Sequence, residues 1–265
     1  MHSRFDHLER LRSEELAHIL ALLPPQSVIL EIGAGMGWQA KALAERGYSV
    51  TAIDLPGSSE AKQRKYAVIE YDGSHIPFPD DHFEVVFSSN VLEHIPHLEA
   101  FQAEIARVLE PGGKAIHIVP SGCWRFWTTL AYYPYLMKKI WNHIFPGGAR
   151  AAGGNAESSA QQRKLLRKLF PPRHGERGSF LSEVLWFSRW QWQRHFRKTG
   201  WKIEAYSPGR LFYTGYEILN LKLSLQTRRR LSRILGSACH VFCLSKNNLR
   251  AHKTQEEPAP ALHTN

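Results

Sequence analysis

The sequence predicts an α/β domain built on a parallel sheet, followed by a segment of different composition. Over residues 25–120, short apolar runs alternate with helical stretches and with turns that contain glycine or proline. Strands that alternate with helices at this spacing form βαβ units, whose crossovers are right-handed. The 265 residues are 43% hydrophobic and 22% charged. These values exclude a wholly disordered chain, a collagen-like chain and a polytopic membrane protein.

The expected elements of this domain follow in a regular order. Apolar residues recur at helical spacing up to Leu23, and Pro24-Pro25 ends this N-terminal helical segment, residues 1–24. We expect strands at 27–32, 48–53, 66–71, 83–88 and 114–120, and helices at 39–46 and 98–109. Gly47 is expected to end the first of these helices, and the turn Pro111–Gly113 the second.

Residues 121–200 form a segment rich in aromatic and basic residues. Residues 123–145 include eight aromatic side chains, the last of them Phe145. Residues 146–160 have the composition of a flexible linker, and 161–170 predict a short basic helix. A longer helix is expected at 182–199. Strands at 201–206 and 238–245 would complete the sheet within residues 201–246, with helix favoured for 216–235, and the polar tail 247–265 is expected to be disordered.

Charge is distributed unevenly along the chain. Residues 1–120 carry 10 basic and 17 acidic residues, whereas 121–265 carry 24 basic and 7 acidic residues. This asymmetry indicates a polyanion or an anionic membrane near the second half, or a solvated basic face. Three cysteines and no Cys-x-x-Cys pair indicate neither a disulfide framework nor a cysteine metal site. With charged residues interrupting the N-terminus, a cytoplasmic protein without a signal peptide is expected.

The most informative motif is the run Glu31-Ile32-Gly33-Ala34-Gly35-Met36-Gly37, which leaves a strand and enters a helix. Glycines at such a point let a ligand approach the backbone closely. The spacing G-x-G-x-G differs from the G-x-G-x-x-G of dinucleotide-binding loops. An acidic residue beside the loop suits a cationic ligand better than a pyrophosphate.

Polar residues stand where the following strands end. Asp54 ends the second strand, where a carboxylate can accept hydrogen bonds from both ribose hydroxyls, although a helix cap is the alternative. Asp72-Gly73 follows the third strand and could bind an adenine amino group or form an ordinary turn. Ser88-Ser89-Asn90 ends the fourth strand. Open α/β sheets bind their ligands at these carboxyl ends.

Together these residues resemble the class I S-adenosylmethionine-dependent methyltransferases over about residues 25–120, most closely the type-11 group that includes ubiquinone- and menaquinone-pathway enzymes. The resemblance implies a Rossmann-like seven-stranded sheet of order 3-2-1-4-5-7-6, with an antiparallel seventh strand and an insertion after strand 5. It implies S-adenosyl-L-methionine as the cofactor, in-line transfer at the sulfonium methyl, and a pocket for its methionine and ribose. The cofactor-binding residues that it implies are Glu31, Gly33, Ala34, Gly35, Gly37, Asp54, Leu55, Asp72, Gly73 and Asn90.

His94 is the candidate catalytic residue, as a general base, with a structural or pocket-lining histidine as the alternative. Some quinone O-methyltransferases of this group have Glu-x-x-Glu-His at this place and bind a divalent metal. Because Asn90 stands where the first Glu would be, we expect no metal.

The acceptor side is expected beyond strand 5. The uncharged run Phe126–Met137 would span ~18 Å as a helix, which is shorter than the ~30 Å hydrocarbon core of a membrane. It could be an interfacial element, a lid or part of the core, and Pro134 would disturb it. In the polar loop 171–176, His174 and Glu176 could face the acceptor or decorate the surface.

We expect a small-molecule or lipid-like acceptor, with peripheral contact to an anionic membrane as one possibility. Four arginines, at 228–230 and 233, could meet lipid phosphates there. An RNA- or DNA-modifying methyltransferase that uses the basic C-terminal half is the alternative, although the Asn/Asp-Pro-Pro-aromatic motif of base-amino methyltransferases does not follow strand 4. A non-catalytic cofactor-binding subunit is a third hypothesis.

Overall fold

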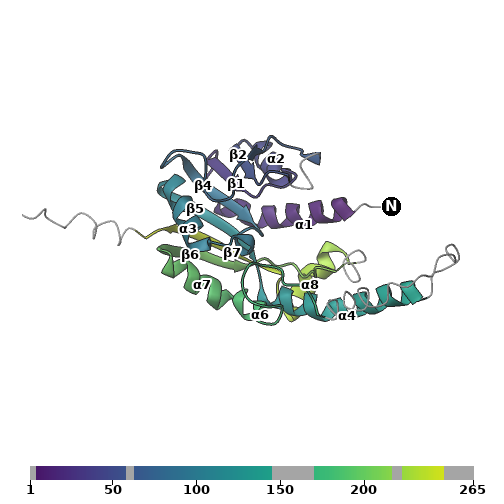
Figure 1. Cartoon of the computed structure of the whole chain (residues 1–265). Coiled ribbons are helices and arrows are strands. Elements are labelled where there is room, and N and C mark those ends of the chain that lie inside the picture. Colours follow the sequence, from purple (N-terminus) through teal and green to yellow (C-terminus); the bar gives the residue numbers. More distant parts are fainter. Residues whose placement is uncertain (1–3, 58–62, 145–169, 217–222, 248–265) are drawn as a thin grey trace, which may run out of the picture.

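The chain folds around one seven-stranded sheet flanked by helices (Figure 1). The computed structural model describes residues 4–57, 63–144, 170–216 and 223–247. The strands are β1 (Val28–Ile32), β2 (Ser49–Asp54), β3 (Ile69–Glu70), β4 (Phe83–Ser89), β5 (Leu109–Pro120), β6 (Trp201–Pro208) and β7 (Cys239–Lys246). The described α-helices are α1 (Arg4–Ile19), α2 (Trp38–Ala44), α3 (Leu98–Val108), α4 (Gly122–Ile144), α6 (Glu183–Trp186), α7 (Arg189–Lys198) and α8 (Leu225–Leu235).

The strand order is β3-β2-β1-β4-β5-β7-β6, as the family resemblance implies. The pairs within β3-β2-β1-β4-β5 are parallel, whereas β7 is antiparallel to both of its neighbours. The order reverses between β1 and β4, so the carboxyl ends of these two strands flank a switch point, where open α/β sheets bind ligands. Side chains of β1, of β4 and of residues 115–120 in β5 are almost wholly buried, as expected for parallel strands covered on both faces.

Several elements differ from the sequence-based expectation. The third strand has two residues rather than six. The chain passes from α3 directly into β5 at Leu109. Leu109 and Lys114 both pair with β4, and the pairing register shifts between them. The expected turn at Pro111–Gly113 lies within this irregular part of β5. The single helix expected at 182–199 is two helices, because Ser188 adopts an extended conformation and caps α7 by accepting the Gln191 N–H. Two expected segments lie almost wholly outside the described residues. These are the helix at 161–170, of which only Phe170 is described, and the tail 247–265, of which only Asn247 is described.

The aromatic segment is a 23-residue helix, α4, that extends away from the sheet beside α6 and α8 (Figure 1). Pro134 lies within it, although we expected this residue to disturb the helix. Proline removes the hydrogen bond to the carbonyl of residue 130, and both Leu130 and Pro134 are exposed. Solvent can therefore satisfy the freed carbonyl. Among the described residues, no helix combines the length and the apolar character needed to cross a bilayer.

Candidate cofactor and acceptor site

The loop between β1 and α2 needs glycine for two reasons. Gly33, Gly35 and Gly37 all have left-handed backbones, with φ of 71°, 55° and 76°. A Cβ on Gly33 would lie 2.3 Å from Val91 Cγ2, and one on Gly37 would lie 2.7 Å from Tyr66 Cβ. The loop is therefore packed directly against the segment that follows β4. The left-handed backbone favours glycine at all three positions, and close packing requires it at Gly33 and Gly37.

Glu31 places a carboxyl group at the end of β1, inside the protein. The residue is 2% exposed, and its Oε2 atom has no hydrogen-bond partner among the described residues. Burial raises the pKa of Glu31 to about 8, and the nearby Asp54 carboxylate acts in the same direction, while the Ala40 N–H opposes the shift. A cationic ligand group would compensate this buried carboxyl, as the sulfonium or amino group of S-adenosylmethionine could.

Asp54 joins the ends of β1 and β2. Its Oδ2 accepts the Gly35 N–H at 2.9 Å, and its Oδ1 accepts the Leu55 N–H at 2.7 Å. The helix-cap alternative for Asp54 does not hold, because these donors belong to the glycine loop and to its own turn. A carboxylate has about four acceptor positions, so two more hydrogen bonds from ribose hydroxyls fit the same group.

Asp72 and Gly73 follow β3. Oδ1 of the exposed Asp72 accepts the N–H groups of Ser74 and His75, both at 2.8 Å, and these hydrogen bonds lower its pKa. This geometry is that of the turn considered as the alternative, and adenine binding by Asp72 stays a prediction. A Cβ on Gly73 would lie 2.6 Å from Leu55 Cδ2. Leu55 is half exposed, so the structure brings these two predicted cofactor residues together.

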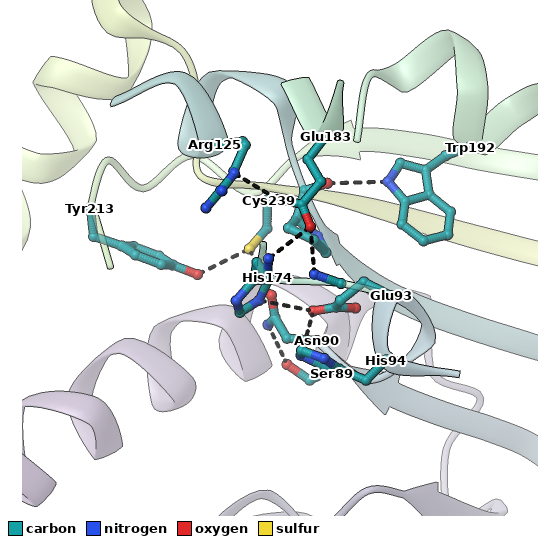
Figure 2. Close-up of polar contacts among 12 residues, drawn as sticks. Ser89, Asn90, Glu93, His94, Arg125, His174, Glu183, Trp192, Tyr213 and Cys239 are labelled. Carbon is teal, nitrogen blue, oxygen red and sulfur yellow. Dashed lines mark hydrogen bonds and ion pairs between the residues drawn. The ribbon is translucent and has the colours of Figure 1, made fainter. Parts of the chain in front are cut away.

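Asn90 turns the chain away from the sheet at the end of β4. Its φ of 55° is left-handed, its N–H donates to the Ile118 carbonyl, and its Nδ2 donates to Ser89 Oγ. Its Oδ1 lies 3.5 Å from Cys239 Sγ on β7 (Figure 2). The side chain therefore points toward β7, across the carboxyl end of β5.

A buried polar network ties α1 to this place. Tyr213 Oη donates to Glu15 Oε1 at 2.7 Å and lies 3.0 Å from Cys239 Sγ. Arg12 pairs with Glu15 at 2.5 Å and donates to Ser89 Oγ at 3.2 Å. The N-terminal helix thus docks over the ends of β4 and β7. Nothing in the periodicity of α1 indicated a buried Glu15, so sequence reasoning missed this network.

His94, the candidate catalytic residue, lies in a cluster with Glu93 and His174. Figure 2 shows both imidazoles directed at the Glu93 carboxylate, and each Nε2 lies 3.8 Å from Glu93 Oε1. The centroids of the two rings are 4.8 Å apart, and the Trp124 ring also contacts His174, with 4.6 Å between centroids. Burial lowers the pKa of His94, with the Glu93 carboxylate opposing this shift. Of the two candidates in the loop 171–176, His174 therefore faces the interior beside His94.

The loop that carries His174 is held by a buried ion pair. Glu183 accepts the N–H groups of His174 and Gly175, both at 2.7 Å, and its other oxygen lies 2.8 Å from Arg125 Nε on α4. The Glu176 N–H donates to the Glu93 carbonyl, and a Cβ on Gly175 would lie 2.8 Å from that oxygen. The insertion after β5 is thus fixed against the segment that follows β4. The sequence contained no signal for Glu183.

The arginine-rich segment does not form the cationic face expected from the sequence. Arg228 is fully buried and donates to the Phe212 and Leu223 carbonyls. Arg229 pairs with Glu14 on α1. Arg230 and Arg233 remain exposed. The idea that all four arginines meet lipid phosphates together is therefore wrong, because α8 uses its first arginine to anchor the chain at Phe212.

Comparisons with known proteins agree with this arrangement. Residues 30–117 match the family model for a methyltransferase domain, Methyltransf_11. Malonyl-[acyl-carrier protein] O-methyltransferase of Serratia marcescens is 37% identical over 93 residues, covering 34% of this chain and 36% of that protein. The 2-methyl-6-phytyl-1,4-hydroquinone methyltransferase of Synechocystis is 33% identical over 104 residues, covering 36% and 32%. This chain thus spans about a third of the length of these relatives.

A solved structure supports the fold over a longer range. The S-adenosylmethionine-dependent methyltransferase from Mesorhizobium loti aligns with a TM-score of 0.52 and 17% identity, covering 88% of this chain and 99% of that one. Sheet order, glycine loop and family match together define a class I S-adenosylmethionine-dependent methyltransferase fold. Residues 30–117 are a methyltransferase domain of the type-11 group, whose cofactor is S-adenosylmethionine.

Proposed function

We propose that this chain transfers the methyl group of S-adenosylmethionine to a small-molecule or lipid-like acceptor. The observation that carries the proposal is the buried Glu31 carboxyl without a partner for Oε2, at the end of β1 and beside the carboxylate of Asp54. The Glu31 carboxyl can bind a cationic group, and the Asp54 carboxylate retains acceptor positions for two hydroxyls. S-Adenosylmethionine carries both kinds of group.

The chain's own residues bind and orient the cofactor. Asp54 holds the ribose, Leu55 and Gly73 flank the adenine and Asp72 accepts its amino group, while Glu31 faces the cationic end. S-Adenosylmethionine supplies an activated methyl group on its sulfonium. Transfer in line then depends largely on alignment, for which well-oriented reactants reach effective molarities of ~10⁵ M or more.

The acceptor binds on the side of Asn90 and His94. Because burial holds the pKa of His94 below its usual value, its imidazole is neutral near pH 7 and can take a proton from an acceptor hydroxyl. Its side chain is 45% exposed, so an acceptor can reach it. An O-methylation is the reaction that this arrangement favours.

A lipid-like acceptor is favoured by the exposed apolar side chains of the insertion. Phe126, Leu130, Tyr133, Met137 and Trp141 recur at spacings of three or four residues along α4, and all are exposed. They therefore form one stripe on the outer face of the helix, which we call the α4 stripe. The Synechocystis relative acts on a phytyl hydroquinone by its name, an acceptor with a long hydrocarbon chain.

The test is methyl transfer from labelled S-adenosylmethionine to lipid and aqueous metabolite fractions. We expect label in a lipid product, and a loss of kcat in His94→Gln with cofactor affinity unchanged. His97→Gln is the matched control, because His97 is exposed three residues further along. Label that appears only in nucleic acid would contradict the lipid-like acceptor. An unchanged kcat in His94→Gln would contradict the role of His94 as a base.

A further inference from the structure

We propose that Glu93, His94 and His174 form a binding site for a divalent transition metal ion of the zinc type. The three ligand atoms come from two segments that are 80 residues apart in sequence, and all lie within 4.8 Å of one another. In Figure 2 both imidazoles and the carboxylate converge on one point, where the loop 171–176 meets the segment after β4.

The distances in this cluster suit a shared ion. Zinc binds histidine nitrogen and carboxylate oxygen at about 2.0–2.2 Å, so two ligands at a tetrahedral angle lie roughly 3.4 Å apart. The two separations between Glu93 Oε1 and the histidine Nε2 atoms are both 3.8 Å. This is too long for a hydrogen bond. Small side-chain rotations would bring the three atoms to coordination distance.

The buried carboxylate of Glu93 is a second, independent observation that supports a metal site. Its side chain is 0% exposed, and neither carboxylate oxygen has a hydrogen-bond partner among the described residues. A buried carboxylate without hydrogen bonds is costly unless it is paired or coordinates a metal. The guanidinium group of Arg125 does not serve this purpose, because it pairs with Glu183. A cation held between Glu93 and the two imidazoles would compensate the buried charge.

The surrounding structure prepares His174 as a ligand. Glu183 fixes the His174 backbone, and the glycine at 175 allows the loop to approach the Glu93 carbonyl. The sequence predicted no metal, because Asn90 stands where the first glutamate of the Glu-x-x-Glu-His pattern would be. The third ligand is instead a histidine from the insertion, which no local motif could reveal.

The site would keep positions open for other ligands. Three protein ligands of the His₂Glu type leave a fourth position for water or substrate in catalytic zinc sites. The side chains of His94 and His174 are 45% and 35% exposed, so solvent reaches the cluster from their side. Resting on the proposed function, this open position would face an oxygen atom of the acceptor. The base role of His94 then belongs to the metal-free protein, and with an ion bound the same imidazole would be a ligand.

The test is metal binding by the full-length, tag-free protein after treatment with a chelator. Titration with Co²⁺, followed by its visible absorption, reports inner-sphere coordination without any need for activity. We expect one Co²⁺ per chain, displaced by Zn²⁺. Because loss of an outer-shell partner typically costs 10–100-fold in metal affinity, we expect His174→Ala and His94→Ala to lose at least about tenfold. The exposed-histidine control His97→Gln should bind as wild type does.

Calorimetry with S-adenosylhomocysteine checks that each variant still folds and binds the cofactor product. Absence of Co²⁺ binding by wild type overturns the proposal, as does equal binding by wild type and a folded His174→Ala protein. Equal weakening in His97→Gln would show adventitious binding to surface histidines and overturn it as well. Each of these results leaves cofactor binding intact, and the proposed methyl transfer is tested separately with labelled S-adenosylmethionine.

Discussion

Asp54 is the residue whose role in cofactor binding is most directly testable. Asp54→Ala removes two charge-assisted hydrogen bonds to ribose, each worth ~1.5–3 kcal/mol before partial compensation by solvent. We expect a loss of about 2–4 kcal/mol, or roughly 30- to 1000-fold in affinity for S-adenosylmethionine, measured by calorimetry. Asp80→Ala, which removes an exposed carboxylate paired with Arg107, is the control. Unchanged affinity in a folded Asp54→Ala protein would refute the assignment.

Glu31 links cofactor binding to proton release. With a pKa of about 8, the free protein carries this carboxyl about 90% protonated at pH 7. A cationic group placed beside it favours the ionised form, so the pKa falls on binding and a proton leaves. The sign is therefore release, of up to about 0.9 proton per chain at pH 7 and less as the pH rises past 8.

The measurement is the enthalpy of S-adenosylmethionine binding at pH 7 in two buffers with different enthalpies of ionisation. A proton released to the buffer makes the two enthalpies differ in proportion. Glu31→Gln should remove the difference, since an amide does not titrate. Equal enthalpies for the wild type would mean that Glu31 does not change its protonation when the cofactor binds.

At the scale of elements, the Arg125–Glu183 pair holds the insertion against the sheet. Removing one partner of a buried ion pair leaves an uncompensated charge and typically costs 3–5 kcal/mol. We expect Glu183→Gln and Arg125→Met each to lower the free energy of unfolding by about this amount. The double variant should lose less than the sum of the two, because no buried charge remains.

Urea denaturation of the four proteins closes the double-mutant cycle. The exposed pair Lys198–Glu99 is a matched control, since exposed pairs contribute ~0–1 kcal/mol. Additive losses at Arg125 and Glu183 would show that the two side chains act independently and that Glu183 stabilises the 171–176 loop alone.

The elements also show how far the sequence predicts this fold. The order of the strands followed from the family resemblance, and the strands themselves from apolar runs bounded by glycine. The break at Ser188 and the helix through Pro134 were missed because local signals were ambiguous. The local sequence around a serine is the same whether the residue caps a helix or lies within one. A proline is tolerated inside a helix where solvent can hydrogen-bond to the freed carbonyl, and exposure of that carbonyl depends on the fold.

The candidate site divides in the same way. Glu31, the glycines and Asp54 lie within one local pattern and were predicted. Glu15, Tyr213 and Glu183 act through contacts between segments far apart in the sequence, and their residue types occur in any soluble protein. Only the fold brings them together, so periodicity and spacing carried no information about them.

At the scale of the whole molecule, the basic second half is less available to a polyanion than its net charge indicates. Arg125 and Arg228 are buried, and Arg229 is paired with a carboxylate of α1. Arg230 and Arg233 on α8 remain exposed, and the last residue of α8 accepts a hydrogen bond from Trp127 of α4. Apolar and cationic groups on neighbouring helices suit the surface of an anionic bilayer.

We therefore expect the α4 stripe to bind anionic vesicles. Met137, 70% exposed, would bury its side chain in the interface, which is worth about 1.5–3 kcal/mol. Met137→Glu removes this gain and adds a negative charge, so partitioning should fall by at least about tenfold. Ala103→Glu, an exposed position on α3, carries the same charge change as a control.

The double variant Arg230→Gln, Arg233→Gln should lose ~2 kcal/mol of the free energy of vesicle binding, at ~1 kcal/mol per charge. This loss should occur only on anionic vesicles. Sedimentation of each protein with phosphatidylserine and phosphatidylcholine vesicles measures these effects, with cofactor calorimetry to confirm folding. Wild type that never sediments, or Met137→Glu that sediments as wild type does, would contradict membrane binding by the α4 stripe and favour an acceptor that reaches the site from solution.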